Sequence, residues 1–188
     1  TPQGTTLQLP RHRKTLIIAP LSVVDSVWKQ HLKKLTPHNV SVINPKRRDD
    51  LSMVATSNTS GYYVVHWEAL RLMPELAKVH WFNIIADECH RLKGLKKGHS
   101  RKGKKSSSMP LMCKAAMQLR SIYKVAMSGT AADNMPDDLW GTLHWLYPNY
   151  YTSYWQFRST YCEETTKENK ETGAAYRTIT GVKNVEHL

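Results

Sequence analysis

Five short runs of apolar residues, rich in β-branched and aromatic side chains, predict strands along the chain. The runs are Thr15–Ala19, Val40–Ile43, Tyr62–Val65, Trp81–Ala86 and Ile122–Met127. Between most of them, apolar residues recur every three or four positions, which is the spacing of one buried helix face. Strands that alternate with amphipathic helices are typical of βαβ units. The pattern therefore predicts an α/β fold in which helices cover both faces of a parallel sheet.

Capping residues and prolines mark the ends of the predicted helices. Ser22 is expected to cap the first helix, which carries apolar residues as far as Leu35. Further helices are expected over 45–54, 67–77, 108–119, 136–146 and 150–161. The polar stretches 91–108 and 165–173 are expected to be loops, and Tyr176–Ile179 is expected to be a short strand.

Composition narrows the class of protein. A length of 188 residues suits one domain or a piece of a larger one, and 40% apolar residues exclude a wholly disordered chain. No apolar run is long enough for a transmembrane helix, and no signal peptide is recognisable. Lys and Arg number 27 against 15 Asp and Glu, so the net charge is +12. This excess favours a polyanionic partner, usually nucleic acid, although composition alone does not separate DNA from RNA or from an acidic membrane surface.

The three cysteines, Cys89, Cys113 and Cys162, are scattered and form no C-x-x-C pair. Their spacing argues against a disulfide framework and against a zinc site. We therefore expect an intracellular, reducing compartment, with the choice between cytoplasm and nucleus open.

Two predicted strands end in groups that can do chemistry. Asp87 and Glu88 follow the fourth strand, and Ser128-Gly129-Thr130 follows the fifth. Ligands of an open parallel sheet bind at the carboxyl ends of its strands. One carboxylate can hold hydrated Mg²⁺ through water, and the next can polarise an attacking water molecule. The alternatives are solvated loop acids and an ordinary Ser-Gly turn.

The same segments resemble a known family. Asp87-Glu88-Cys89-His90 resembles motif II of the superfamily 2 helicases, and the Arg91-Leu92-Lys93 that follows is most similar to the Swi/Snf-type DNA-dependent ATPases. Similar matches to motif III, to motif Ia and to the segment that leads out of the first motor domain lie at 126–140, 15–28 and 176–188. The resemblance covers nearly the whole chain.

The resemblance implies a RecA-like first lobe of a P-loop NTPase motor, which binds ATP and Mg²⁺ and couples hydrolysis to translocation on DNA, expected to be duplex. Asp87 would be the Mg²⁺-binding acid, acting through water, and Glu88 the catalytic base. His90 would link motif II to motif III. Ser128, Gly129 and Thr130 would couple hydrolysis to movement, and Ser22 would lie near the DNA backbone. Ala131 stands where the family usually has proline.

The phosphate-binding loop departs from the family pattern. Gly98–Lys105 matches G-x-x-x-x-G-K in part, but it follows a basic stretch and lies after the acidic motif, so we interpret it as a chance match. Gly4-Thr5-Thr6 resembles the family's Gly-Lys-Thr with Thr5 in place of the lysine, and these residues are the candidate nucleotide contacts. Motif I is therefore expected to be degenerate or to lie in a longer protein. Residues 1–148 would form the lobe, and 149–188 would lead toward a second lobe outside this sequence.

A basic segment follows motif II. Its candidate DNA-contacting cations are Arg91, Lys93, Lys96, Lys97, Arg101, Lys102, Lys104 and Lys105. The alternative is a solvated loop. For the whole chain the alternatives are a non-catalytic nucleic-acid-binding module and another superfamily 2 motor, such as an RNA helicase or a restriction-enzyme subunit. The aromatic residues of 140–157 have mostly helical spacing, which favours packing over base stacking.

Overall fold

The computed structural model describes residues 13–47, 54, 60–98, 109–130, 135–169 and 171–187. These residues form two compact units. The first comprises the described residues up to Asp87 together with Gln118–Val125, and the second comprises those of 88–117 and those from Ala126 onward. Within the described residues, no helix has both the length and the apolar character needed to cross a membrane.

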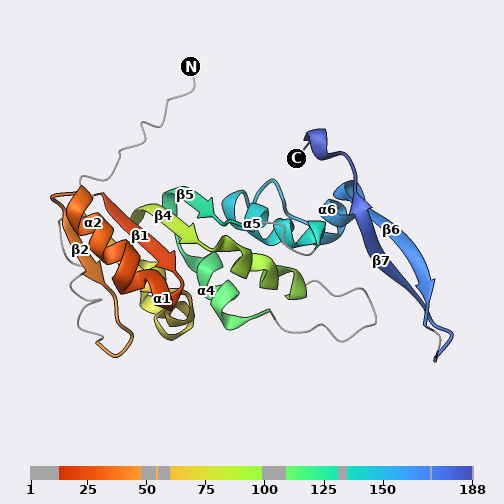
Figure 1. Ribbon diagram of the computed structural model, residues 1–188, viewed down its shortest axis with the longest axis horizontal. Coiled ribbons are helices and arrows are strands. Elements are labelled where there is room, and N and C mark those ends of the chain that lie inside the picture. Colours follow the sequence, from red (N-terminus) through yellow and green to blue (C-terminus); the bar gives the residue numbers. More distant parts are fainter. Residues whose placement is uncertain are drawn as a thin grey trace, which may run out of the picture. The chain divides into compact units, whose positions relative to one another are not determined.

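A five-stranded sheet organises the first unit, in the order β2-β3-β1-β4-β5 (Figure 1). The strands are β1 (Lys14–Ala19), β2 (Asn39–Val42), β3 (Gly61–His66), β4 (Trp81–Asp87) and β5 (Ser121–Met127). β1 runs parallel to both β3 and β4, and β2 runs parallel to β3. The predicted strands and the parallel α/β fold are therefore confirmed.

The core of this unit forms around β1, whose six residues are all buried. Ile17 and Ala19 pack with Val64 of β3 against Val24, and Trp28 and Leu32 cover the same cluster. The covering helical segment consists of α1 (Leu21–Val23), η1 (Val24–Lys29) with π-helical hydrogen bonding, and α2 (Gln30–Leu35). Val24, Trp28 and Leu32 match the three- and four-residue spacing predicted for the first helix, whereas Leu35, at the end of that spacing, is exposed.

The described strand β5 lies at one edge of the sheet. Its large apolar side chains are exposed, at 38% for Ile122, 53% for Tyr123, 44% for Val125 and 38% for Met127. Neighbouring residues of a strand point to opposite faces, so β5 exposes apolar side chains on both of its faces.

Two local predictions in the first unit are wrong. Ser22 does not cap the first helix: Pro20 holds the N-cap position, and the Ser22 carbonyl accepts a hydrogen bond from Ser26 Oγ. The helix predicted over 67–77 is two 3-10 segments, η2 (Trp67–Leu72) and η3 (Pro74–Lys78). They meet at Met73, whose φ of −132° is not helical, because the following proline disfavours the helical conformation before it.

The second unit begins where a loop was predicted. Cys89–Gly98 forms a 3-10 segment, η4, whose Leu92 and Leu95 are fully buried. The part of that predicted loop from 99 to 108 and the predicted helix over 45–54, apart from Pro45–Arg47 and Val54, lie outside the described residues. Pro45 and Lys46 form a turn there.

The remaining elements are helices followed by a ribbon. They are α4 (Leu111–Gln118), η5 (Pro136–Asp138), α5 (Leu139–Leu146), α6 (Tyr154–Tyr161), β6 (Cys162–Glu168), β7 (Ala175–Val182) and η6 (Val185–His187). β6 pairs antiparallel with β7, with a bulge at Glu163 and Glu164. The prediction of a loop from Thr165 is therefore wrong as far as Glu168, and the predicted short strand belongs to the longer β7. Trp140 and Trp145 are fully buried, as the packing interpretation of the aromatic residues predicted.

Gly141 brings α5 against η4. A Cβ at this position would lie 2.2 Å from the carbonyl oxygen of Leu92, so only glycine allows this approach. Gly141→Ala should therefore lower the free energy of unfolding by about 1–3 kcal/mol, although alanine favours a helix by about 1 kcal/mol. Gly129→Ala is the control, because no atom lies within 4 Å of its added Cβ. Equal urea unfolding curves for the two variants would contradict this packing.

Candidate functional site

Two tryptophan side chains hold Asp87, the last residue of β4. Trp28 Nε1 donates a hydrogen bond to Asp87 Oδ2 at 2.8 Å, and Trp67 Nε1 donates one to the Asp87 carbonyl oxygen at 2.8 Å. Trp28 belongs to the helical segment after β1, and Trp67 begins the segment after β3. The carboxylate is therefore fixed in orientation by the strands that neighbour it.

The backbone turns sharply at Glu88. Its φ of 52° lies in the left-handed region, which side chains other than glycine rarely adopt. Such a conformation costs on the order of 1–3 kcal/mol and is concentrated at functional sites. The turn gives the two consecutive acids different surroundings, although they adjoin in sequence.

Glu88 forms a cluster with His90 and Ser128. The Ser128 hydroxyl donates to Glu88 Oε2 at 3.2 Å, and His90 Nδ1 lies 3.1 Å from the same oxygen and 3.2 Å from Ser128 Oγ. The tautomer of His90 with a proton on Nδ1 fits both contacts, because the Ser128 proton goes to Glu88. The Glu88 side chain is 40% exposed and the His90 side chain 32%, so the cluster is open to a ligand.

The cluster joins the groups that follow the ends of β4 and β5, as the sequence predicted. Thr130 also belongs to it, because its backbone N–H donates to Ser128 Oγ at 3.1 Å. Gly129 lies between the two, with no atom within 4 Å of the position of an added Cβ. The arrangement can orient the Glu88 carboxylate toward a water molecule or hydroxyl.

The donor set suits a hard cation held mainly by water. Within the described residues, no group of three His, Cys, Asp or Glu side chains is placed to hold a metal ion. Mg²⁺ keeps several of its waters and is held in proteins by one or two carboxylates together with substrate phosphates. The oriented carboxylate of Asp87 fits that role.

Lys96 is not placed as a free phosphate-contacting cation. Its Nζ lies 3.1 Å from Asp137 Oδ1 and 2.5 Å from Asp138 Oδ1, and both carboxylates are nearly buried. Tyr154 donates to the other Asp137 oxygen at 2.5 Å. Burial by itself would lower the pKa of Lys96, but the hydrogen bonds and charges of Asp138 and Asp137 outweigh it and raise the pKa. Burial, followed by the hydrogen bond to Asp137, likewise raises the pKa of Tyr154.

This ion-pair cluster continues into the ribbon. Arg158 pairs through Nε with Glu164, whose other oxygen lies 3.5 Å from Arg177 Nη1. Burial raises the pKa of the neighbouring Cys162 thiol to about 11. All three cysteines are buried.

The other predicted nucleic-acid contacts are only partly described. Arg91 and Lys93 lie on η4 and are half-buried, and Ser22 is exposed on α1. Gly4, Thr5, Thr6, Arg101, Lys102, Lys104, Lys105 and the side chain of Lys97 lie outside what the structure describes.

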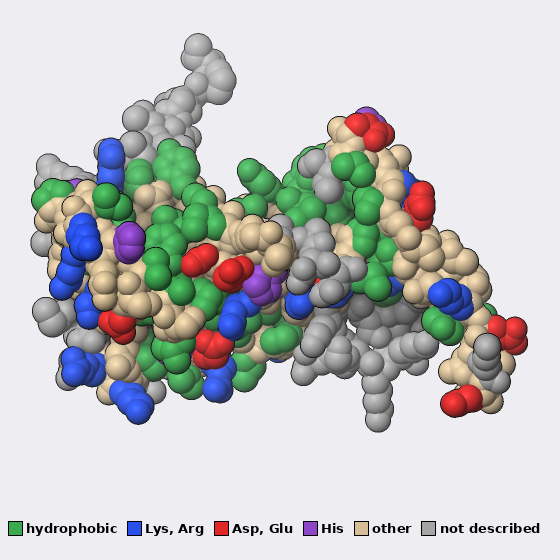
Figure 2. All heavy atoms as spheres, viewed as in Figure 1, with side chains coloured by type: hydrophobic (Ala, Val, Ile, Leu, Met, Phe, Trp, Pro, Cys, Tyr) green, Lys and Arg blue, Asp and Glu red, His purple; other side chains and the backbone are tan. Residues whose placement is uncertain are grey.

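The sequence analysis missed two features of the site. One is the pair of indoles that hold Asp87. Their only signal in the sequence was one tryptophan among the apolar residues of each predicted helix. The other is a basic surface on the first unit: Figure 2 shows Lys and Arg side chains gathered over α2 and β2. Lys33, Lys34, Lys46 and Arg47 are exposed there.

Comparisons with known proteins show which proteins the chain is similar to. The model of the SNF2-related domain family matches residues 5–181. The chain is 26% identical to the mouse "DNA excision repair protein ERCC-6-like 2", over 92% of this chain and 10% of the relative. It is 27% identical to the Arabidopsis thaliana "ATP-dependent DNA helicase DDM1", over 83% of this chain and 20% of the relative. The chain therefore spans a fifth or less of the length of these curated relatives.

A solved structure is also similar. The Sulfolobus solfataricus SWI2/SNF2 ATPase core in complex with dsDNA matches with a TM-score of 0.63 and 26% identity. The match covers 80% of this chain and 28% of that core.

The Lys96 cluster leads to a prediction about stability. Lys96→Met should lower the free energy of unfolding at neutral pH by about 3–5 kcal/mol, because it leaves two buried carboxylates without their cation. Lys114→Met on α4 is the control: Lys114 is exposed, so we expect a change within about 0.5 kcal/mol.

The pH dependence has a definite sign. A lysine whose pKa is raised on folding stabilises the fold fully below its unfolded pKa, near the ordinary value of 10.5, and loses this contribution as the pH rises through the folded pKa. The difference in unfolding free energy between the unmodified chain and Lys96→Met should therefore narrow at alkaline pH. If the difference in unfolding free energy stays constant at pH values well above 10.5, the ion-pair assignment of Lys96 is contradicted.

Proposed function

Because the chain belongs to the SNF2-related domain family, we propose that it forms the ATP-binding lobe of a DNA-dependent ATPase that couples ATP hydrolysis to translocation on DNA. The observation that carries this proposal is the contact of Glu88 with His90 and Ser128, since it joins the paired acids after β4 to the hydroxyl residues after β5. This is the convergence that a nucleotide site at the carboxyl ends of parallel strands requires.

Asp87 is the proposed Mg²⁺ ligand, acting through a water molecule. When bound, Mg²⁺ supplies positive charge that neutralises the phosphates of the nucleotide. The proposed role of Asp87 is to present its carboxylate in one orientation. The hydrogen bond from Trp28 to that carboxylate supports this role. The hydrogen bond from Trp67 to its carbonyl fixes the backbone behind it.

Glu88 is the proposed base that polarises the attacking water. Ser128 and His90 both contact Oε2, and Oε1 is the proposed oxygen for the reacting water. General-base help of this kind contributes roughly 10²–10⁴ in rate. Ser128, Gly129 and Thr130 are proposed to couple hydrolysis to movement, because any displacement of that turn pulls on the hydrogen bond to the base.

Gly4, Thr5 and Thr6 are the proposed contacts of the nucleotide phosphates, on their resemblance to the family motif alone. We propose that residues 1–148 form the lobe and that 149–188 lead toward a second lobe. An isolated chain is then expected to be inactive in hydrolysis, because the second lobe would complete the site.

Duplex DNA is the proposed partner. The similarity to a core solved in complex with dsDNA supports it, as does the net charge of +12. The proposed contacts are Arg91, Lys93 and the remaining cations of the basic segment, with Ser22 near the backbone. We exclude Lys96 from them, because its charge is paired with Asp137 and Asp138. The three scattered cysteines, with no C-x-x-C pair, support a reducing compartment inside the cell.

A non-catalytic nucleic-acid-binding module is the rival proposal. Its support is the basic charge together with the departure from the phosphate-loop pattern. Equilibrium ATP binding separates the two, because only the ATPase lobe requires Mg²⁺-dependent nucleotide affinity.

The catalytic proposal is tested by Glu88→Gln in the protein that contains both lobes. DNA-stimulated ATP hydrolysis should fall by about 10²–10⁴, since the amide cannot polarise water, while duplex DNA binding should be unchanged. Glu75→Gln, on η3, is the matched control and should hydrolyse ATP normally. Hydrolysis by Glu88→Gln within a factor of a few of the unmodified rate would remove Glu88 from the role of base.

The DNA contacts are tested by the salt dependence of binding. Replacing Arg91 and Lys93 together by Gln should weaken duplex binding and flatten the plot of log affinity against log salt, by about 0.9 for each lost phosphate contact. Lys167→Gln is the control, because Lys167 is exposed among the acids of β6. An unchanged slope in the double variant would show that η4 does not contact phosphate.

A further inference from the structure

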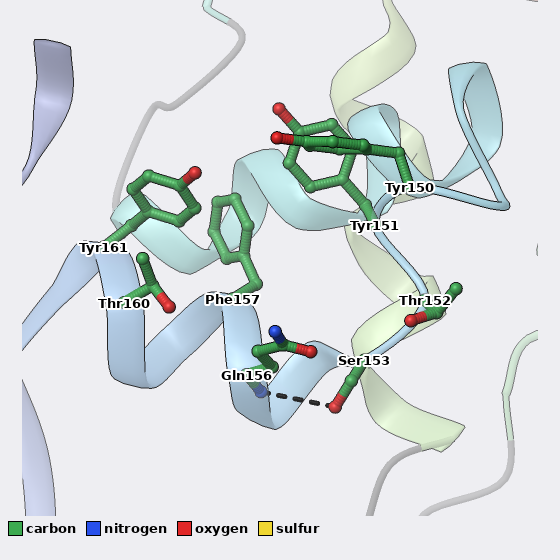
Figure 3. Close-up of a pocket in the computed structure, with 8 residues that line it drawn as sticks. All are labelled: Tyr150, Tyr151, Thr152, Ser153, Gln156, Phe157, Thr160 and Tyr161. Atoms are coloured by element: carbon green, nitrogen blue, oxygen red, sulfur yellow. Dashed lines mark hydrogen bonds between the residues drawn. The ribbon is translucent and has the colours of Figure 1, made fainter. Parts of the chain in front are cut away.

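A pocket of about 280 Å³ lies beside α6 in the second unit (Figure 3). It is formed by the segment that leads into the helix and by one face of the helix itself. Its eight lining residues are all uncharged: Tyr150, Tyr151, Thr152, Ser153, Gln156, Phe157, Thr160 and Tyr161. None of these residues belongs to the Glu88 cluster or to the ion pairs of Lys96.

The aromatic rings of the pocket are held against one another. Tyr150 and Tyr151 have centroids 4.8 Å apart, Tyr151 and Phe157 6.0 Å, and Phe157 and Tyr161 4.8 Å. Phe157 and Tyr161 are buried, whereas Tyr150 is 75% exposed. The buried rings therefore fix the wall of the pocket, and Tyr150 leaves a ring surface open to a ligand.

The polar groups of the pocket can hydrogen-bond a neutral ligand. Ser153 Oγ accepts the capping hydrogen bond from the Gln156 backbone, so its own proton remains to be donated. Burial, and then the neighbouring Tyr161, Tyr150 and Tyr147, raises the pKa of Tyr151, so its hydroxyl stays protonated at neutral pH. The Gln156 side chain is exposed and carries both a donor and an acceptor.

These properties select a small, planar and uncharged ligand. Ligand pockets usually measure about 300–1,000 Å³, so this one suits a fragment the size of a single base. Aromatic stacking contributes about 1–3 kcal/mol for each base, and the amide of a glutamine pairs with the edge of adenine.

The backbone of Lys183 lies beside the pocket. The Lys183 backbone N–H donates to the Tyr161 carbonyl at 3.0 Å, and Asn184 Nδ2 donates to the Thr160 carbonyl at 2.8 Å. The chain after β7 is therefore bound to the last turn of α6, and the exposed Lys183 lies next to a lining residue. These two hydrogen bonds anchor the segment that carries Lys183 beside the pocket.

We propose that this pocket takes one unstacked nucleobase of a DNA strand and that Lys183 contacts a phosphate next to that base. The proposal rests on the DNA-binding function proposed above and adds to it a site for a base outside the duplex stack. Since extruding a base costs a few kcal/mol, a bulged or single-stranded base is the preferred ligand.

The test uses the 188-residue chain and a duplex that carries one bulged 2-aminopurine, whose fluorescence falls when it stacks on an aromatic ring. An end label reports total binding by anisotropy. Tyr150→Ala should abolish the quenching and weaken binding to the bulged duplex by about 5- to 150-fold, the equivalent of the stacking contribution. Tyr150→Phe should keep both, and the affinity for a fully paired duplex should be the same in all variants.

Tyr176→Ala on β7 is the matched control, because Tyr176 is also an exposed tyrosine, at 48%. The proposal is overturned if the bulged duplex binds without quenching, or if the quenching survives in Tyr150→Ala. It is also overturned if a proline-rich peptide binds the chain in a Tyr150-dependent way and displaces the bulged base, since the pocket would then be a peptide site.

Failure of the DNA-binding function would give a different result. If neither duplex binds the unmodified chain, the proposed DNA-binding function fails. Titration of the chain with free 2-aminopurine riboside then tests whether the pocket binds a base. If the unmodified chain quenches the riboside and Tyr150→Ala does not, the pocket is a base site. If the unmodified chain does not quench the riboside, the base-site proposal is overturned.

Discussion

The parallel pairing of β1 with β4 determines where the groups around Asp87 lie. Its register places Ile18 opposite Ala86, so the next residues, Ala19 and Asp87, end their strands at the same level. On the other side of β1, Ala19 is level with His66 of β3. The segments that follow β1 and β3 therefore begin beside Asp87, and each supplies one indole to it. A shift of one residue in this register would move both donors out of reach.

The left-handed backbone at Glu88 is the second constraint. Consecutive residues of an extended strand point to opposite faces of the sheet. If Glu88 continued the strand, its side chain would therefore point away from that of Asp87. The turn at Glu88 ends the strand and directs its side chain to Ser128. One acid is therefore held by indole N–H groups and the other by a hydroxyl and an imidazole, which suits different tasks for the two carboxylates.

The sheet was predictable because burial on both faces leaves continuous apolar runs, as in β1. The ribbon was harder to predict, since β6 is polar and largely exposed and is defined by its pairing with β7. Lys96 is indistinguishable in sequence from the other cations of the basic segment, and only its nearness to Asp137 and Asp138 separates it from them. The pairing of the two strand-end motifs was predictable from the parallel topology, whereas the indole donors depend on the depth at which Trp28 and Trp67 are packed.

The open edge at β5 has a practical consequence. This strand has a single neighbour in the described sheet and carries apolar side chains on both faces. An unpaired, apolar strand edge is a template for intermolecular β-pairing, which natural proteins avoid by charges, bulges or covering segments. Preparations of this chain by itself should therefore self-associate more strongly as the protein concentration rises, and a lysine introduced at Tyr123 or Val125 is the simplest solubilising change.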